Sequence, residues 1–379
     1  MVALHNIVIA GSGIVGNSLA YFFAKRNVPV TIIDPVGIAP GASRKAGGFL
    51  ARDWRDGTIL QEIQQQGFDL HQELANDLGS ERIGYRRLTC MSVSIQEEDN
   101  VVSHHPKQRP DLEWVDRGVI NAKSMGEEDT IAQVHPLKLC EAMWDYAEST
   151  VGSKLKIGRV TKACFEKDSE TLKGVELDDG TTIDAKTLIV ACGPWTEQSR
   201  SWFPKHLQCK IPQITGVKCH SILIRAPKTL NQAVFFEGDG PLLGSAGLEV
   251  YPRPDGDAYV NGFEGNEIIV DEQPGQEQIE SQAIDKLQTA TDQTTSVLEG
   301  LEPHTKQAGY WPETPDGFPI LDKIIDGAYL ATGHSVWGIL QGPITGKAMC
   351  ELVLDGKATC IDLKPFQLDR FSIYDDDSF

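Results

Sequence analysis

Two apolar runs near the start of the chain, with a helical pattern between them, predict a βαβ unit. The first run covers residues 7–10 and ends at a glycine, which is typical of a short strand buried on both faces of a parallel sheet. Apolar side chains then recur at helical intervals from Ile14 to Phe23, and a second apolar run ends at Asp34. Because so apolar a strand needs cover on both faces, we expect the first strand in the middle of its sheet.

After residue 34, the hydrophobic pattern distinguishes segments that belong to the same parallel sheet and its helices from a segment of short alternating strands. Helices are predicted over 58–78 and 136–150, and the apolar run 187–192 reads as another strand of the parallel sheet. Residues 209–263 instead alternate in short strands between Gly, Pro and Asp turns, which indicates an antiparallel sheet. A polar helix is predicted to follow over 277–298.

We therefore predict an α/β protein with a Rossmann-like nucleotide-binding domain and an inserted α+β substrate domain built on an antiparallel sheet. At 379 residues the chain is long enough for about two domains. The predicted nucleotide-binding segments are 1–84, 131–208 and 302–379, and the predicted substrate segments are 85–130 and 209–301.

Three glycines in the first turn give the βαβ unit its chemistry. Gly11, Gly13 and Gly16 have the G-x-G-x-x-G spacing, in which the first allows a tight turn, the second admits a pyrophosphate and the third lets helix and strand pack closely. Asp34 ends the second strand, where a carboxylate accepts the hydroxyls of an adenosine ribose. Strand, glycines, helix, second strand and acid occur in order, so we favour a dinucleotide site over a merely structural turn.

A second glycine-rich segment follows at residues 41–48. Ser43 is expected to cap a short helix that begins at Arg44, which would bring Arg44 and Lys45 close to the pyrophosphate. The small residues 46–48 leave room for a planar ring system. A glycine-rich loop without a ligand is the alternative for this segment.

Composition narrows the classes of partner and compartment. A net charge of −19 argues against nucleic acid and against unaided binding to anionic membranes. The eight cysteines include no C-x-x-C pair, and neither a transmembrane run nor a secretory signal is evident, so we expect reduced thiols and a cytoplasmic protein. His104 and His105 have no third ligand at useful spacing, and we expect no metal site.

With these motifs in place, the chain resembles the D-amino-acid oxidase and glycine oxidase superfamily of FAD-dependent oxidoreductases. The matching segments are Ile9–Gly16 with Asp34, Gly41–Gly48, Val160 with Gly174–Gly180 and Leu188–Trp195, and Thr314–Pro319 with Ala331–Gly338. The sequence around 47–54 is similar to a fungal and plant branch of the superfamily, one yeast member of which is linked to endosome-to-Golgi transport. The resemblance thus implies noncovalent FAD, an amine-like substrate, molecular oxygen as acceptor, and for this branch a location peripheral to late endosomes.

Motif and resemblance together predict which residues hold the cofactor. The turn 336–340 opens the last helix, whose N–H groups would face the flavin pyrimidine edge, where a reduced flavin carries negative charge. The predicted cofactor residues are Gly11, Ser12, Gly13, Ile14, Val15, Gly16, Asp34, Ser43, Arg44, Lys45, Ala46, Gly47, Gly48, Val160, Ala191, Cys192, Gly193, Trp195, Val336, Trp337, Gly338, Ile339 and Leu340.

The sequence departs from the family at the position that would identify the substrate. Members that oxidise small amino acids pair the substrate carboxylate with an arginine where Trp311 stands here, which puts a simple amino-acid substrate in doubt. Gly309 occupies the place of the flavin-linking cysteine of sarcosine-oxidase relatives, which implies noncovalent FAD. Trp311 and His334 are the candidate catalytic residues, and for His334 a histidine satisfied by hydrogen bonds is the open alternative.

Other side chains are candidates for the substrate pocket. A cation in place of the missing arginine is expected among Arg52, Arg55 and Arg253, each of which is alternatively a solvated surface arginine. Tyr251, Trp54 and Trp337, together with Trp311, are candidates for an aromatic pocket over the flavin, or alternatively for the core.

Three functions remain open from the sequence. The first is an FAD-dependent amine oxidase or dehydrogenase that transfers hydride from a C–N bond to flavin N5. The second is a flavin-fold protein with an interaction role in trafficking. The third, an NAD-dependent dehydrogenase, fits the first βαβ unit but leaves the C-terminal motifs unexplained.

Overall fold

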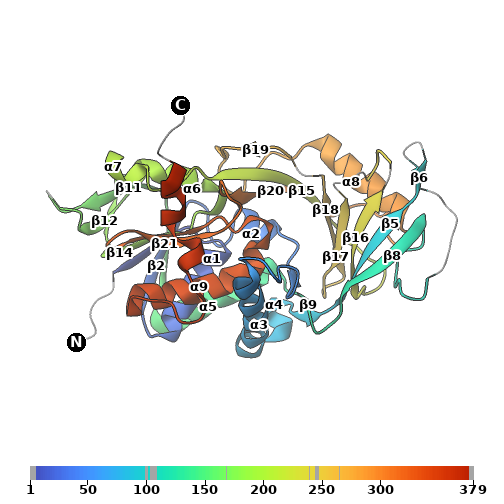
Figure 1. The fold of residues 1–379 in the computed structure, drawn as a ribbon, viewed down its shortest axis with the longest axis horizontal. Coiled ribbons are helices and arrows are strands. Elements are labelled where there is room, and N and C mark those ends of the chain that lie inside the picture. The colour runs from blue at the N-terminus through green and yellow to red at the C-terminus, as the bar shows by residue number, and fades with distance from the viewer. Residues whose placement is uncertain are drawn as a thin grey trace.

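The computed structural model describes residues 6–98, 101–102, 109–167, 169–238, 240–243, 247–263 and 265–374. The molecule is elongated, with a parallel sheet at one end and a second large sheet at the other (Figure 1). The pair His104 and His105 lies outside the described residues.

The first sheet has six strands, with the glycine-motif strand near its centre. Their spatial order is β10 (Lys154–Ile157), β2 (Val30–Asp34), β1 (Ile7–Ala10), β14 (Thr187–Val190), β22 (Ala328–Thr332) and β21 (Ile320–Ile325). All neighbours are parallel except β21 and β22. The predictions that residues 7–10 form an inner strand and that 187–192 returns beside it are confirmed.

Opposite faces of β1 enter two different cores, as its apolar run predicts. Ile7 and Ile9 pack with the helices α1 (Ile14–Lys25), α3 (Gln61–Leu78), α5 (Pro136–Val151) and α9 (Gly338–Asp355). Val8 and Ala10 face the small antiparallel sheet β11 (Val160–Phe165), β12 (Leu172–Leu177) and β13 (Thr182–Asp184), beside the short helices α6 (Thr196–Ser199) and α7 (Lys205–Gln208).

Helices α1 and α9 approach closely because α9 presents glycines to α1. A Cβ at Gly342 would lie 2.7 Å from a side-chain carbon of Ile14, and one at Gly346 would lie 2.8 Å from the Leu19 nitrogen. Any larger residue at these positions would push the helices apart. This packing holds the start of α9 beside the start of α1.

The second large sheet lies at the other end of the molecule and is mostly antiparallel. Its strands are, in order, β19 (Glu267–Ile268), β15 (Thr215–Arg225), β18 (Asp257–Gly262), β17 (Leu248–Pro252), β16 (Gln232–Gly238), β5 (Thr89–Ile95) and β8 (Val119–Gly126). The strands of residues 209–263 pair antiparallel, as predicted, and β5 from outside that segment joins them by a parallel pairing with β16. Helix α8 (Ser281–Thr294) covers one face, and the other face turns toward the rest of the molecule.

One long strand joins the C-terminal segment to this second sheet. Strand β20 (Thr305–Glu313) pairs antiparallel with β15, from Thr305 opposite Leu223 to Glu313 opposite Thr215. Figure 1 shows the two strands reaching from the parallel sheet into the second sheet. The predicted domain boundary at residue 302 stays a prediction. Strand β20 comes after this boundary in the sequence, but it pairs with β15 of the second sheet.

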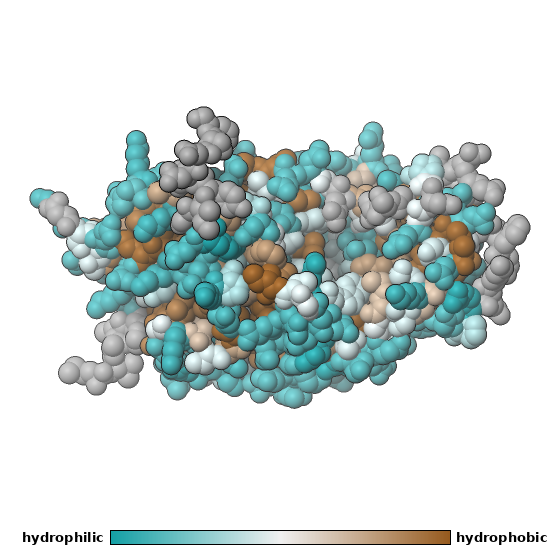
Figure 2. Space-filling view, in the orientation of Figure 1, coloured by the Kyte–Doolittle hydropathy of each residue, from teal (hydrophilic) through white to brown (hydrophobic). Residues whose placement is uncertain are grey.

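Several short elements complete the described chain. These are α2 (Ala42–Lys45), α4 (Ser80–Ile83), the three-stranded sheet of β3 (Phe49–Ala51), β9 (Ile131–Gln133) and β4 (Arg86–Arg87), and the hairpin β6 (Glu97–Glu98) with β7 (Val101–Val102). The β6–β7 hairpin lies at the outer end of the second sheet (Figure 1). On the face drawn in Figure 2, hydrophilic residues predominate and hydrophobic ones form scattered small groups. Within the described chain, no helix combines the length and apolarity that a membrane crossing requires.

Candidate active site

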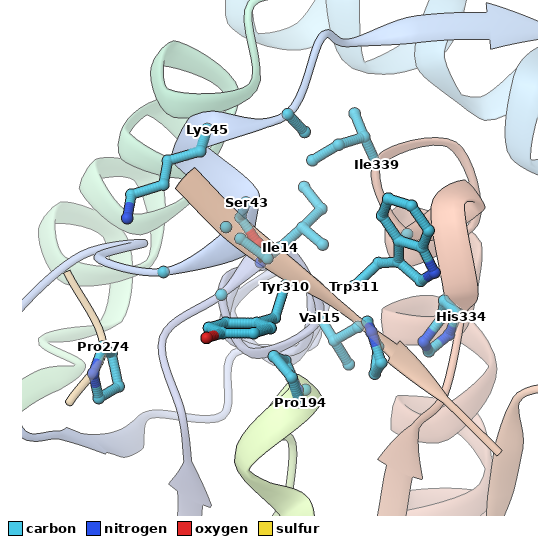
Figure 3. A pocket seen from close by; sticks show the side chains of 18 of the residues that line it. Ile14, Val15, Ser43, Lys45, Pro194, Pro274, Tyr310, Trp311, His334 and Ile339 are labelled. Carbon is cyan, nitrogen blue, oxygen red and sulfur yellow. Dashed lines mark hydrogen bonds between the residues drawn. The ribbon is translucent and has the colours of Figure 1, made fainter. Parts of the chain in front are cut away.

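A cavity of about 400 Å³ lies between the two large sheets and is lined by both. Its walls come from the loops after β1, β2 and β14, from α2, from one face of the second sheet and from the first turn of α9. Figure 3 shows side chains from α1, β20 and the start of α9 around this one space. Segments far apart in the sequence therefore share a single site.

The glycine turn brings bare backbone to the cavity wall. Gly11 has φ +103°, and a Cβ there would be closer to the Ala191 carbonyl than the 3.0 Å that real Cβ atoms respect. Gly13 is the N-cap of α1, has no side chain of its own and lines the cavity, so backbone at the positive end of the helix is exposed there. Gly16 does not line the cavity, because it packs against the backbone of Gly11 behind the turn.

Ser43 caps a different helix from the predicted one. The prediction that it begins a helix at Arg44 is wrong, because α2 starts at Ala42 and its N-cap is Gly41. The Ser43 hydroxyl instead accepts a hydrogen bond of 2.9 Å from the Ile14 N–H. The second glycine-rich segment is thereby fixed to the start of α1.

Asp34 is buried and holds the turn around it. One carboxylate oxygen accepts the Ser12 N–H at 3.0 Å, and the other accepts the N–H groups of Val36 at 3.0 Å and Gly37 at 3.1 Å. Asp34 and Ser12 both line the cavity. The predicted contact with an adenosine ribose stays a prediction.

The two basic residues of segment 41–48 differ in whether they line the cavity. Lys45 lines the cavity and forms an ion pair with Glu277, whose side chain is fully buried. Arg44 is exposed and does not line the cavity, so the structure gives no support to its predicted phosphate contact. The one-turn helix α2 projects successive side chains in different directions, and only Lys45 reaches inward.

The loops around Val160 and β14 form the nucleotide end of the cavity. Val160, Ala191, Cys192, Gly193 and Trp195 all line it, as predicted residues of the site. The Trp195 indole N–H donates to the Glu272 carbonyl at 2.6 Å, and a Cβ at Gly41 would lie 2.7 Å from the Trp195 ring. The loop that carries Glu272 therefore closes over this end of the cavity.

The start of α9 forms another wall of the cavity. Val336, Trp337, Gly338 and Ile339 line the cavity, whereas Leu340 is buried beyond it. No side chain caps this helix. Among the described residues, the indole nitrogen of Trp337 is fully buried and has no hydrogen-bond partner.

Two buried histidines support that first turn. His71 of α3 lies 3.0 Å from the Ile339 carbonyl through Nε2, and His334 lies 2.9 Å from the Thr345 hydroxyl. Burial lowers the pKa of each to about 4. His334 lines the cavity, but it is neutral near pH 7 and has a hydrogen-bond partner, which favours the structural alternative over a proton-transfer role.

These histidines predict a loss of stability in mild acid. Their pKa in the unfolded chain is about 6.5, so between pH 6.5 and 4 the unfolded chain binds protons that the folded chain does not. The free energy of unfolding should therefore fall as the pH falls through this window, by on the order of 1 to 2 kcal/mol for each histidine at pH 5. Urea unfolding at pH 7 and pH 5 measures this.

The matched variants separate the buried histidines from other titrating groups. His71→Gln should make the pH dependence between 6.5 and 5 shallower without removing it, because burial also lowers the pKa of His334 and His135 to about 4, whereas His206→Gln, at an exposed position, should leave it unchanged. Equal slopes for wild type and His71→Gln would contradict the assignment.

Strand β20 presents neighbouring aromatic side chains to opposite sides. Figure 3 shows Tyr310 and Trp311 pointing away from each other, with Trp311 directed toward the start of α9. The Tyr310 hydroxyl donates to Glu272 at 2.9 Å. Gly309 lies against Lys45 and has no side chain that a cofactor could be attached to.

None of the three predicted cations lines the cavity. Arg52 forms a surface ion pair with Asp69 at 2.9 Å. Arg55 lies with its guanidinium carbon 5.2 Å from the ring centre of Trp337. Arg253 is buried and donates to the Ala46 carbonyl at 3.0 Å, so it supports the second glycine-rich segment from outside.

The predicted aromatic pocket is assembled, and it contains residues that the sequence analysis missed. Trp54, Tyr251 and Trp337 line the cavity as predicted, and Phe49, Phe235, Tyr310 and Glu249 join them. Phe49 and Phe235 follow the alternation of β3 and β16, which distinguishes the two faces of a strand but not which face meets a cavity. Glu249 reads in the sequence as an ordinary solvent-facing position of an alternating strand.

Comparison with known proteins agrees with this geometry. The model of the DAO family, described as FAD dependent oxidoreductase, matches residues 6–352. The chain belongs to this family. The match confirms the resemblance and makes FAD the cofactor, which also removes the NAD-dependent alternative.

Fungal and bacterial relatives align with nearly the whole of this chain. A Schizosaccharomyces pombe protein described as an oxidoreductase is 30% identical, over 94% of this chain and 96% of the relative. TDA3 of Saccharomyces cerevisiae is 24% identical over 94% and 93%. The crystal structure of glycine oxidase from Geobacillus kaustophilus superposes with a TM-score of 0.74 at 21% identity, covering 96% of this chain and 98% of that one, which shows the same fold. The fungal branch of the resemblance is thus supported.

The residues present fit noncovalent FAD. The start of α9, which its N-cap residue leaves without a side-chain cap, and the backbone exposed at Gly13 offer donors, and Gly309 leaves no point of attachment. Within the described chain, no group of His, Cys, Asp or Glu side chains has an arrangement that could hold a metal ion.

Proposed function

We propose that this oxidoreductase oxidises a C–N bond of an amine or imino compound, with FAD as the electron acceptor and molecular oxygen as the final acceptor. The observation that carries the proposal is the continuity of the cavity. It runs from the glycine turn to the start of α9 and on to an aromatic wall from the second sheet. The proposal therefore places a dinucleotide and a small organic compound in one continuous cavity.

The chain's own residues supply binding and electrostatics for this chemistry. Bound FAD would take a hydride at N5 from the carbon next to nitrogen, while the nitrogen lone pair forms the C=N bond. The uncapped start of α9 places positive backbone charge at the cavity wall, and a helix start stabilises negative charge of the kind that a reduced flavin carries. His71 and the close packing of α9 on α1 hold that turn in place.

The relatives support the same class of reaction. Glycine oxidase and the L-proline dehydrogenase of P. horikoshii, whose structure superposes with a TM-score of 0.74, are named for amino compounds. Trp311 stands where the resemblance expects a carboxylate-binding arginine, and none of the predicted arginines takes its place in the cavity. The proposal therefore stops at the C–N bond and does not extend to amino acids.

The test begins with the visible spectrum of the purified protein, which should show a flavin band with about one FAD per chain. Anaerobic mixing with a panel of primary and secondary amines and imino compounds should bleach the band for at least one compound. Admission of air should then restore it, with hydrogen peroxide as product. Free FAD mixed with the same panel is the control.

One outcome would overturn the proposal. If dithionite reduces the bound FAD and no compound of the panel does, amine oxidation fails, and the interaction role in trafficking becomes the better hypothesis. Failure to bind added FAD at all would contradict both the proposal and the cofactor assignment.

A further inference from the structure

The wall that the second sheet gives to the cavity carries one carboxylate, Glu249 on β17. The Tyr251 hydroxyl donates to its Oε2, and the Asn261 amide donates to the same oxygen at 3.2 Å. All three residues line the cavity. Two donors from this sheet thus hold the carboxylate in place.

The same end of the cavity carries a cluster of aromatic side chains that pack on one another. Phe49 stacks on Tyr251 with ring centres 5.1 Å apart and planes 15° apart, and it lies 5.2 Å from Trp54. The ring centre of Phe235 lies 5.2 Å from that of Trp54 and 5.6 Å from that of Tyr251. The ring centres of Trp337 and Trp54 are 6.1 Å apart. All five rings line the cavity. Ring faces attract cations, most strongly where water is excluded.

The other charged side chains of the cavity are committed to its nucleotide end. Among the residues that line it, the cations are Lys45, which pairs with Glu277, and Arg159, which donates to Gln198. Asp34, the remaining carboxylate, accepts three backbone N–H groups of the glycine turn. Burial keeps the His334 imidazole neutral by lowering its pKa to about 4. Among the described residues that line the cavity, Glu249 is the charged side chain of the aromatic end; Arg55 lies over the Trp337 ring, 5.2 Å from its centre, but does not line the cavity.

From this geometry we infer that the substrate is a cationic amine with no carboxylate beside its reacting carbon. Its charge is recognised by Glu249, next to the aromatic side chains of Phe49, Trp54, Phe235, Tyr251 and Trp337. The inference rests on the proposed function for the fate of the amine: the bound ammonium would first give one N–H proton to Glu249 or to water, and the freed lone pair would then form the C=N bond as the hydride leaves. The recognition of a cation is a separate property of the pocket. A carboxylate brought into this end would face Glu249 and lose its hydration without compensation. Monoamines, diamines and N-methylated amines meet the requirement, whereas free α-amino acids do not.

Binding of ions that cannot be oxidised tests the recognition directly. The FAD-loaded protein is titrated with tetramethylammonium and, separately, with acetate, and binding is followed by calorimetry and by the flavin difference spectrum. We expect tetramethylammonium to bind and acetate to show no binding over the same concentration range. Glu249→Gln should weaken tetramethylammonium binding at least about tenfold, because the cation–carboxylate attraction in a water-poor pocket is lost.

The variants are chosen so that a folding defect cannot imitate the result. A glutamine at 249 keeps an oxygen that accepts the hydrogen bonds from Tyr251 and Asn261, so FAD content and melting temperature should stay near wild type. Glu267→Gln, at an exposed glutamate on β19 of the same sheet, makes the same change of charge outside the cavity and should leave binding unchanged. Binding of acetate in preference to tetramethylammonium, binding of neither ion, or equal affinity in Glu249→Gln would overturn the inference.

A second arm compares amino acids with their decarboxylated counterparts. Rates of anaerobic FAD reduction are measured for glycine and methylamine, proline and pyrrolidine, and lysine and cadaverine. In every pair that reacts, the amine should be the faster partner, and a faster amino acid would overturn the inference. If tetramethylammonium binds through Glu249 while no amine reduces the FAD, the proposed function fails and the recognition of a cation stands.

Discussion

Replacement of Gly16 by alanine is expected to abolish FAD binding and to destabilise the parallel-sheet part of the molecule. A Cβ at Gly16 would penetrate the carbonyl of Gly11, a backbone atom that no rotamer change can move aside. Gly11 in turn donates to the Ile33 carbonyl at 2.8 Å and lies against the Ala191 backbone. Relief of the clash would therefore shift the turn relative to β2 and β14, at a cost at or above the ~3 kcal/mol upper end of ordinary overpacking.

Thermal unfolding and the flavin content of the purified variant measure this effect. Gly356→Ala is the control, because Gly356 ends α9 with φ +78° and no atom lies within 4 Å of a Cβ there. That variant carries only backbone strain of about 1 kcal/mol and should keep its FAD. A Gly16→Ala protein that retains FAD and melts close to wild type would contradict the role assigned to this glycine.

The parallel sheet was predictable because its evidence is local. The run at residues 7–10 and the run at 187–192 are apolar on both faces, and burial on both faces is what the structure shows. The glycine spacing likewise predicts contacts within one turn. Such features need no knowledge of distant residues.

The parts that were missed depend on pairs far apart in the chain. Ser43 looks like the cap of its own helix, but its hydroxyl caps α1, 29 residues earlier. Gly342 and Gly346 lie within an ordinary helical pattern, and only the position of α1 explains why they are small. The parallel pairing of β5 with β16 joins strands whose local alternation fits either direction.

The candidate site follows the same division. Its nucleotide end was assigned from contiguous motifs, and those residues line the cavity with the exceptions of Gly16, Arg44 and Leu340. At the reactive end the three candidate arginines do not line the cavity, and the sequence could not decide this, because whether Arg253 faces a cavity or the back of a loop depends on which strands flank it. Glu249 was missed for the same reason. The alternation of its strand does not show that the polar face of that strand lines a cavity.

Breaking the buried ion pair between Lys45 and Glu277 is the other change for which we expect a large effect. The Glu277 side chain is fully buried, and the second carboxylate oxygen has no hydrogen-bond partner. Lys45→Met leaves that negative charge in the interior without its cation. A loss of about 3 to 5 kcal/mol in the free energy of unfolding is expected, measured on the FAD-free protein by urea unfolding.

Two further variants divide this loss between folding and ligand binding. The double variant Lys45→Met with Glu277→Gln should recover most of the stability, because no unpaired charge remains. It should still bind FAD more weakly than wild type, since the cation beside the glycine turn is gone. Lys25→Met, which breaks an exposed pair with Asp77, should cost less than about 1 kcal/mol and leave FAD affinity unchanged. If Lys45→Met is no more destabilising than Lys25→Met, the pair does not stabilise the fold. Full FAD affinity in the double variant would assign Lys45 a purely structural role.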